Sequence, residues 1–220
     1  MNIKAAVVVG VLTAFAGAMQ AAPVDNYAFG GLGNLHSSTH TFSPVGGSGP
    51  SITASGFQVQ YRGGLTAVGL YSKGSGVFPP PNDESGLGLV NDPTGDNEIT
   101  QGSFIMLNLT DLSLSSLGIY TESTTSPDEW EIWGSNSAAY VGENFSIPTS
   151  GVLTGTTEGD QNVSSLEGDR YIFISAVKGN ILLGGLTANS AVPEPASAGL
   201  LGLAFMGAGL LFRKRLIKKA

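Results

Sequence analysis

The amino-acid sequence predicts an all-β fold, a single β-sandwich, for the central part of the chain. The composition includes 32 Gly and only 12% charged residues, which favours turns over surface helices. Between residues 24 and 190, short apolar runs are separated by Gly, Pro, Asn and Asp, without a sustained helical period. The chain has no cysteine, so a hydrophobic core, and not disulfides, must hold this domain together.

Six segments have the apolar and β-branched content that is typical of strands. In chain order they are residues 56–61, 65–71, 103–109, 117–120, 129–133 and 171–177. Segments 103–109 and 171–177 are nearly continuous apolar runs. We therefore expect these two strands to lie centrally and to be covered on both faces.

Two connections between strands have distinctive sequences. Residues 178–180, Lys-Gly-Asn, separate segment 171–177 from the apolar residues 181–183, which predicts a hairpin late in the chain. Residues 79–81 are three consecutive prolines that remove three backbone donors, so a paired strand cannot continue there. We expect residues 77–83 to form an exposed loop.

The N-terminus has the layout of a secretory signal peptide. Lys4 precedes an apolar run at residues 5–18, and small residues continue through Ala22 to Pro23. Cleavage after Ala18 fits the small-residue rule, whereas cleavage near Ala21 or Ala22 fits the onset of polar sequence at Pro23 better, and both sites stay open. The sequence therefore predicts a signal helix at residues 1–22 and export of the domain at residues 23–190.

The C-terminus has three parts in a fixed order. A Pro-Glu-Pro sequence comes first, an apolar segment at residues 198–212 follows, and a basic cluster comes last. A helix over residues 196–212 would be about 25 Å long, sufficient to span a bilayer with little tilt. Basic residues stay on the cytoplasmic side, which places the preceding domain outside. The residues concerned are Pro193, Glu194 and Pro195 for the motif, and Arg213, Lys214 and Arg215 for the basic stop.

This end, residues 191–220, resembles the PEP-CTERM sorting signal of exported bacterial proteins. The resemblance implies recognition by an exosortase, a membrane transpeptidase of bacteria that also produce exopolysaccharide. It further implies processing close to the Pro-Glu-Pro sequence, a transient stay in the inner membrane, and a final place in the cell envelope or extracellular matrix. Phrases such as Glu129-Trp130-Glu131-Ile132-Trp133 also resemble the β-rich domains found ahead of this tail.

The exported part of the chain is strongly acidic. Its basic residues are Arg62, Lys73, Arg170 and Lys178, four against 17 acidic residues when Glu194 is counted, a net charge of −13. Nucleic acid is therefore excluded as a partner, because phosphate binding requires a basic surface. A divalent cation is compatible with this charge.

Alternation along strand 129–133 predicts one candidate binding surface. Trp130 and Ile132 lie on one face, and Glu129, Glu131 and Trp133 lie on the other. If the first face is core, an exposed indole beside two carboxylates would suit a sugar ring. Alternatively, Trp133 fills a second core layer. The Trp-Gly-Ser-Asn sequence at residues 133–136 resembles jelly-roll sandwiches of the galactose-binding type, which implies a jelly-roll fold here.

An oxygen-rich turn at residues 91–98 predicts a candidate calcium site. Asp92, Thr94, Asp96 and Glu98 stand at alternate positions, and calcium binds six to eight such oxygens. The same residue types are also those of an ordinary turn. The acidic segment 158–162 would supply further ligands if it lies nearby.

Binding or structural work in a polysaccharide matrix is the function that these observations favour. The chain lacks the Gly-x-Ser-x-Gly and His-Glu-x-x-His motifs, and its two histidines, His36 and His40, lie in a Ser/Thr-rich stretch. We therefore expect no enzyme. A carbohydrate-active enzyme using paired carboxylates is the alternative, and a purely structural coat protein without a concave aromatic site is a third.

Overall fold

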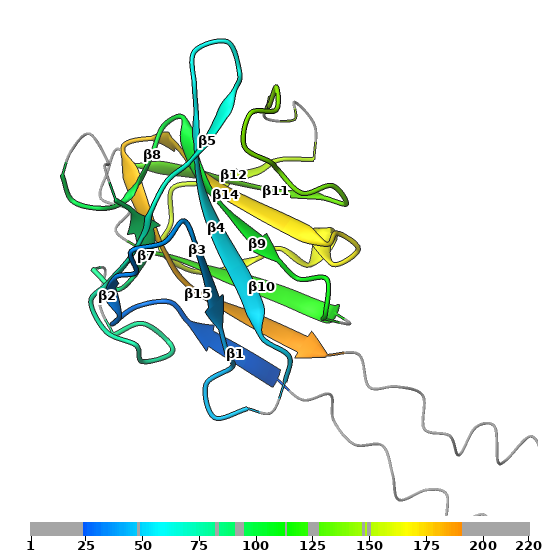
Figure 1. Ribbon diagram of the computed structural model, residues 1–220. Coiled ribbons are helices and arrows are strands. Elements are labelled where there is room, and N and C mark those ends of the chain that lie inside the picture. Colours follow the sequence, from blue (N-terminus) through cyan, green and yellow to red (C-terminus); the bar gives the residue numbers. More distant parts are fainter. Residues whose placement is uncertain are drawn as a thin grey trace, which may run out of the picture. The chain divides into compact units, whose positions relative to one another are not determined.

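The computed structural model describes residues 24–190, apart from residues 48, 82–83, 91–94, 113, 123–127, 147 and 149–150. Two antiparallel sheets pack as a sandwich (Figure 1), which confirms the predicted fold class; the finer jelly-roll comparison stays a prediction. The predicted signal helix and C-terminal helix lie outside the described residues. Within the described part of the chain, no helix has the length and apolar character needed to cross a membrane.

One sheet has eight strands, with β15 at its centre. The order is β13-β10-β15-β7-β6-β2, and β1 and β8 also pair with β15. The long strands are β10 and β15, so most of this sheet is organised around them. The bounds are β1 Val24–Ala28, β2 Gly33–Asn34, β6 Leu70–Lys73, β7 Gly86–Leu89, β8 Ile99–Thr100, β10 Leu114–Glu122, β13 Gly159–Asn162 and β15 Asn180–Ser190.

The other sheet has seven strands in the order β12-β11-β14-β9-β4-β3, and β5 pairs with β4. The bounds are β3 Thr39–Phe42, β4 Ile52–Val59, β5 Leu65–Ala67, β9 Ser103–Asn108, β11 Glu129–Ser135, β12 Leu153–Gly155 and β14 Tyr171–Lys178. A short 3-10 helix, η1 Ser164–Leu166, precedes β14. The strands β9 and β14 lie side by side at the centre of this sheet.

The main core lies between the two sheets. Alternate residues of β9 and β14, such as Ile105, Leu107 and Ile174, face alternate residues of the eight-stranded sheet, such as Leu87 and Leu183, and all are fully buried. Side-chain alternation in extended strands produces this arrangement. The other face of each sheet must then be polar or find a second cover.

The outer face of the seven-stranded sheet has such a cover. A second apolar cluster consists of Phe57, Leu65, Phe104, Met106, Trp133, Ala139 and Phe173. Phe104 is 1% exposed and its ring contacts the rings of Phe57, Trp133, Phe145 and Phe173. The strands β9 and β14 are therefore central and buried on both faces, as their apolar sequences predict.

The predicted hairpin at residues 178–180 is wrong in its pairing. A tight turn is present, and Gly179 has a φ of +69°, but β14 pairs with β9 and β11 while β15 pairs within the other sheet. Both flanking strands are apolar enough to be central strands, and each one takes its own partners. The turn therefore carries the chain from one sheet to the other.

The predicted strand at residues 65–71 is two strands in the structure. β5 pairs with β4, whereas β6 pairs with β7 in the opposite sheet. The chain crosses from one sheet to the other at Val68 and Gly69. Val68 N donates to Gly56 O of β4, in the seven-stranded sheet. Gly69 O accepts from Val90 N, directly after β7 of the eight-stranded sheet. The apolar run at residues 65–71 continues on both sides of Gly69, so its pattern alone did not separate the two strands.

Replacing Phe104 by alanine tests whether the outer cluster is a packed core. We expect F104A to lower the free energy of unfolding by about 3 kcal/mol, because the change removes a buried ring with four aromatic neighbours. Urea denaturation of residues 23–190 measures this. The control is Y61A, which removes a ring that is 91% exposed and should change stability by less than about 0.5 kcal/mol. Equal, small losses in both variants would contradict the assignment.

Candidate functional site

An open groove lies on the outer face of the seven-stranded sheet. Its volume is about 370 Å³, and its floor is formed by β4 and β9 through Phe57 and Met106. Polar side chains along the groove come from Ser38, Thr39, Ser55 and Asn108, and aromatic side chains come from Tyr140 and Tyr171. We refer to this hollow as the outer groove.

One wall of the outer groove is the segment 136–146, here called the clasp loop, which follows β11. Backbone hydrogen bonds attach it to the β4–β5 hairpin: Gly142 N donates to Leu65 O at 2.9 Å, and Phe145 N donates to Gly63 O at 2.7 Å. Ala139 N also donates to Met106 Sδ at 3.3 Å. The loop is thus fixed to the sheet at several points, so the groove exists before any ligand arrives.

Aromatic packing beneath the clasp loop also fixes the loop to the sheet. Phe145 stacks on Phe104 with ring centroids 4.8 Å apart, which anchors the far end of the loop in the second apolar cluster. Tyr140 remains 65% exposed and Val141 remains 64% exposed. Because the loop is anchored by Phe145 and Ala139, its exposed residues are held at the groove edge.

The chemistry of the outer groove is that of uncharged hydrogen bonding. Hydroxyls of serine and threonine donate and accept, the Asn108 amide does both, and tyrosine adds an apolar ring with a polar end. Among the described residues that line the groove, none carries a charge. Concave sites with apolar walls and a few polar groups are typical of small-molecule and sugar binding.

Trp133 does not offer an open platform. It is 2% exposed, and its indole stacks on Phe173 with centroids 5.3 Å apart and planes 6° apart. Trp130 and Ile132 face the main core as alternation predicts. The structure therefore corresponds to the alternative in which Trp133 fills a second core layer, because the clasp loop covers the face that the sequence left open.

The two carboxylates of the predicted sugar platform lie outside the outer groove. Glu129 and Glu131 are half-buried on β11, where Glu131 is paired with Ser175 on one side and Thr154 on the other. Burial raises the pKa of Glu131, and a hydrogen bond with Ser175 opposes this rise. No residue of this pair contributes to the groove lining described above.

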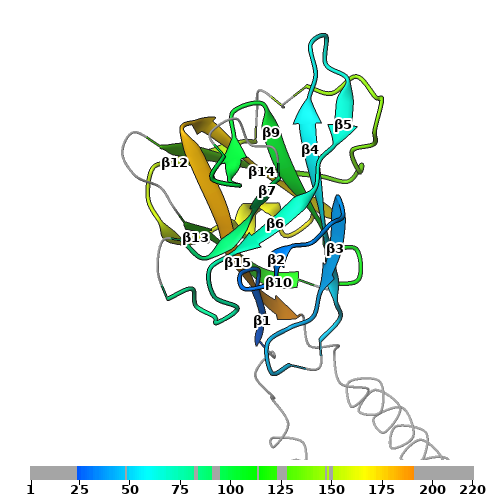
Figure 2. The same ribbon diagram turned by 60° about the vertical axis from the view of Figure 1, so that its left-hand side comes forward.

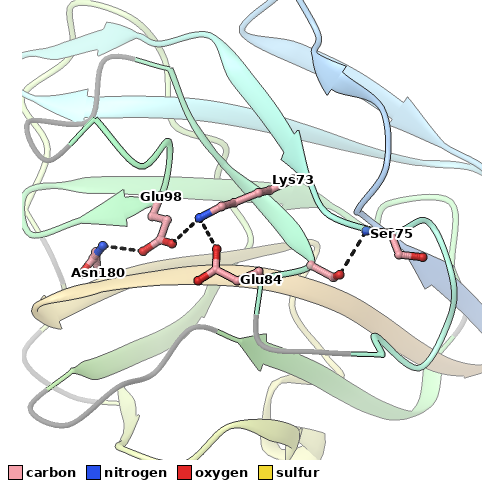
Figure 3. Close-up of polar contacts among 6 residues, drawn as sticks. Lys73, Ser75, Glu84, Glu98 and Asn180 are labelled. Carbon is pink, nitrogen blue, oxygen red and sulfur yellow. Dashed lines mark hydrogen bonds and ion pairs between the residues drawn. The ribbon is translucent and has the colours of Figure 1, made fainter.

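Of the four predicted calcium ligands, two lie among the residues that the structure describes. Asp92 and Thr94 lie outside the described residues, and Asp96 is exposed. Glu98 is only 3% exposed, and its carboxylate accepts hydrogen bonds from Lys73 Nζ at 2.9 Å and from Asn180 Nδ2 (Figure 3). No group of three or more metal-binding side chains is found among the described residues. Glu98 therefore belongs to an internal ion pair in this structure.

This ion pair connects three parts of the eight-stranded sheet. Lys73 on β6 contacts both Glu98, just before β8, and the exposed Glu84, while Asn180 begins β15 (Figure 3). Burial alone would lower the pKa of Lys73, but the two carboxylates raise it by hydrogen bonding and charge. The ammonium thus compensates the charge of the buried Glu98 carboxylate.

Removing Lys73 tests this compensation. We expect K73M to lower the free energy of unfolding by about 2 to 3 kcal/mol, because it leaves Glu98 buried without its cation. The double variant K73M/E98Q should recover much of that loss, since the uncompensated charge is gone. Urea denaturation of all variants, with E98Q alone to complete the double-mutant cycle, measures the coupling. Additive losses would contradict it.

The raised pKa of Glu131 gives a pH-dependent prediction. A carboxyl group whose pKa is higher in the folded state destabilises the fold when ionised, and this cost disappears as pH falls through the raised pKa toward the ordinary value of 4.5. We therefore expect E131Q to be more stable than the wild type at pH 7 and equally stable near pH 4. Thermal unfolding across this range measures the difference. A less stable E131Q at pH 7 would show that the hydrogen bond with Ser175 outweighs burial.

The outer groove and the ion pair are the features that the sequence did not identify. The groove residues come from β3, β4, β5, β9, β14, the clasp loop and the residue before β3, so no single segment of the sequence contains them. Lys73 offered a signal, because it is one of four basic residues in the exported domain. Its partner Glu98 was assigned to the calcium site instead.

The comparisons with known proteins concern the end of the chain. Residues 191–215 match the PEP-CTERM protein-sorting motif, a match that includes Pro193, Glu194 and Pro195 as well as the basic residues 213–215. Neither the curated proteins nor the solved structures contain a match. The predicted sorting motif is confirmed, and it implies an exported protein of the cell envelope that is targeted to an exosortase.

Proposed function

We propose that the β-sandwich of this exosortase-targeted protein binds a neutral polysaccharide of the extracellular matrix through the outer groove. The proposal is supported by the sorting motif, which implies an exported protein of the cell envelope. The observation that carries the proposal is the lining of the groove, which combines two tyrosines with serine, threonine and asparagine side chains.

The charge of the domain favours a neutral ligand over an acidic one. From residue 24 to residue 190 there are four basic and 16 acidic residues, so a polyanion is repelled at distances up to about 8 Å at physiological salt. The groove itself has no cation among its described lining residues to offset this repulsion. A neutral sugar chain meets hydroxyls, an amide and tyrosine rings without an electrostatic cost.

Binding is favoured over catalysis by the same lining. Glycosidases need two carboxyl groups on opposite sides of the scissile bond, and no Asp, Glu or His is among the described residues of the outer groove. Glu131, whose pKa is raised by burial, lies elsewhere on β11. A purely structural coat protein, the third possibility from the sequence, would not need a concave aromatic site.

Two variants of the groove test the proposal. We expect Y140A and Y171A each to weaken binding to the neutral fraction of the producing cells' exopolysaccharide by about fivefold to tenfold, the loss of one ring contact. Calorimetry or pull-down with the processed protein measures this. Y61A is the control, because it removes an exposed tyrosine ring that does not line the groove.

The ligand class is tested in the same experiment. Binding to the neutral fraction should change little between low and high salt, whereas a charged ligand gives a strong salt dependence. Preferential binding to an acidic fraction, or equal binding by Y61A, Y140A and Y171A, would overturn the proposal. Urea denaturation of each variant excludes loss of folding as the cause.

A further inference from the structure

The two ends of the folded domain lie side by side. β1, its first strand, pairs antiparallel with the end of β15, its last strand, from Val24 opposite Asn189 to Ala28 opposite Gly185. Both views of the ribbon show β1 and β15 next to each other at one end of the sandwich (Figures 1 and 2). The polypeptide chain therefore enters and leaves the folded domain at the same end of the sandwich.

The end of β15 has neighbours on both sides. Asn189 is opposite Val24 of β1 and Ser116 of β10, and Ser190 is opposite Leu114 of β10. Ser115 Oγ donates a further hydrogen bond to Asn189 O at 3.1 Å. The backbone of this segment is thus committed to the sheet up to its last residue.

The sorting signal begins where the sheet ends. β15 ends at Ser190 and the match to the sorting motif starts at residue 191. Only two residues separate Ser190 from Pro193, so their Cα atoms are at most about 10 Å apart even in a fully extended chain. An enzyme that acts at the motif must therefore work directly beside the paired end of β15.

Proteolytic enzymes act on backbone that is free of such pairing. Cleavage of a folded protein proceeds through locally opened states, and its rate follows the population of the open form. Burial limits how far the end of β15 can separate from its neighbouring strands. Asn189 is half-buried and Val24 is 57% exposed, whereas Ala188 is 1% exposed and packs in the main core beside Leu117.

We propose that exosortase processing passes through a locally opened state, in which residues 189–190 have separated from β1 and β10 while Ala188 stays in the core. The end of the eight-stranded sheet is then a determinant of the sorting rate, in addition to the motif itself. This inference depends on strand pairing and on the position of the motif, and it is independent of the ligand of the outer groove.

A disulfide across the β1–β15 pair tests the inference in the producing cells. The natural chain has no cysteine, so the two introduced cysteines have no other partner within the chain. Opposed residues of antiparallel strands also have a suitable spacing for a disulfide. We expect the full-length V24C/N189C variant to be processed about tenfold more slowly than the wild type or slower. The S116C/N189C variant should be processed as slowly as V24C/N189C, and it leaves the N-terminal segment unchanged.

Three controls make the result specific. T41C/T53C places the same cross-link between β3 and β4, where the two threonine hydroxyls are 3.3 Å apart, and should be processed at the wild-type rate. A P193A/E194A/P195A variant should remain unprocessed. Insertion of a Gly/Ser linker of about eight residues after Ser190 should restore the rate of V24C/N189C, because about 25 Å of free chain then separates motif and sheet.

Processing is followed by the mass of the protein over time, under non-reducing conditions that also verify the disulfide. A wild-type rate in both oxidised locked variants would overturn the inference, as would an equal delay in T41C/T53C. A delay that persists after the linker is inserted would also overturn it, because the distance to the sheet would then be irrelevant.

Discussion

The structure depends on the burial of both faces of β9 and β14. Their sequences are apolar at nearly every position, so one face fills the space between the sheets and the other needs a separate cover. Phe145 of the clasp loop supplies that cover, while Trp133 and Phe57 extend the apolar face from the neighbouring strands β11 and β4. The clasp loop is held down by this second cluster, and the outer groove is the space left where the cover ends. The requirement to bury a hydrophobic sheet face thereby produces the concave surface.

The buried ion pair of the eight-stranded sheet meets a second constraint, the attachment of the short strand β8. β8 is only two residues long, so its place beside β15 is not secured by many ladder bonds. Glu98, Lys73 and Asn180 join the start of β8, β6 and the start of β15. A buried ion pair contributes little net stability compared with apolar residues of the same volume, but it discriminates against other arrangements because an unpaired charge would be costly.

The sequence allowed prediction of the features that depend on local pattern. Alternation placed Trp130 and Ile132 in the core correctly, and continuous apolar runs marked the central strands β9 and β14. Prediction failed where contacts between segments that are distant in the sequence determine the structure. Whether Trp133 is exposed depends on the clasp loop and on Phe173, and the turn at Gly179 is compatible both with a hairpin and with a crossing between sheets. The choice between them is made by β9, β10 and β11, which the turn does not reveal.

The position of β15 links completion of the eight-stranded sheet to the start of the sorting motif. As the last strand of the domain, it is also the one that pairs with β10, β1, β7 and β8, so the eight-stranded sheet cannot form before residue 190 is available. The sorting motif follows directly after that residue. Residue 190 is therefore needed both to complete this sheet and to lead into the sorting motif. In such a molecule, the folded state of the sheet and access to the motif are properties of the same few residues.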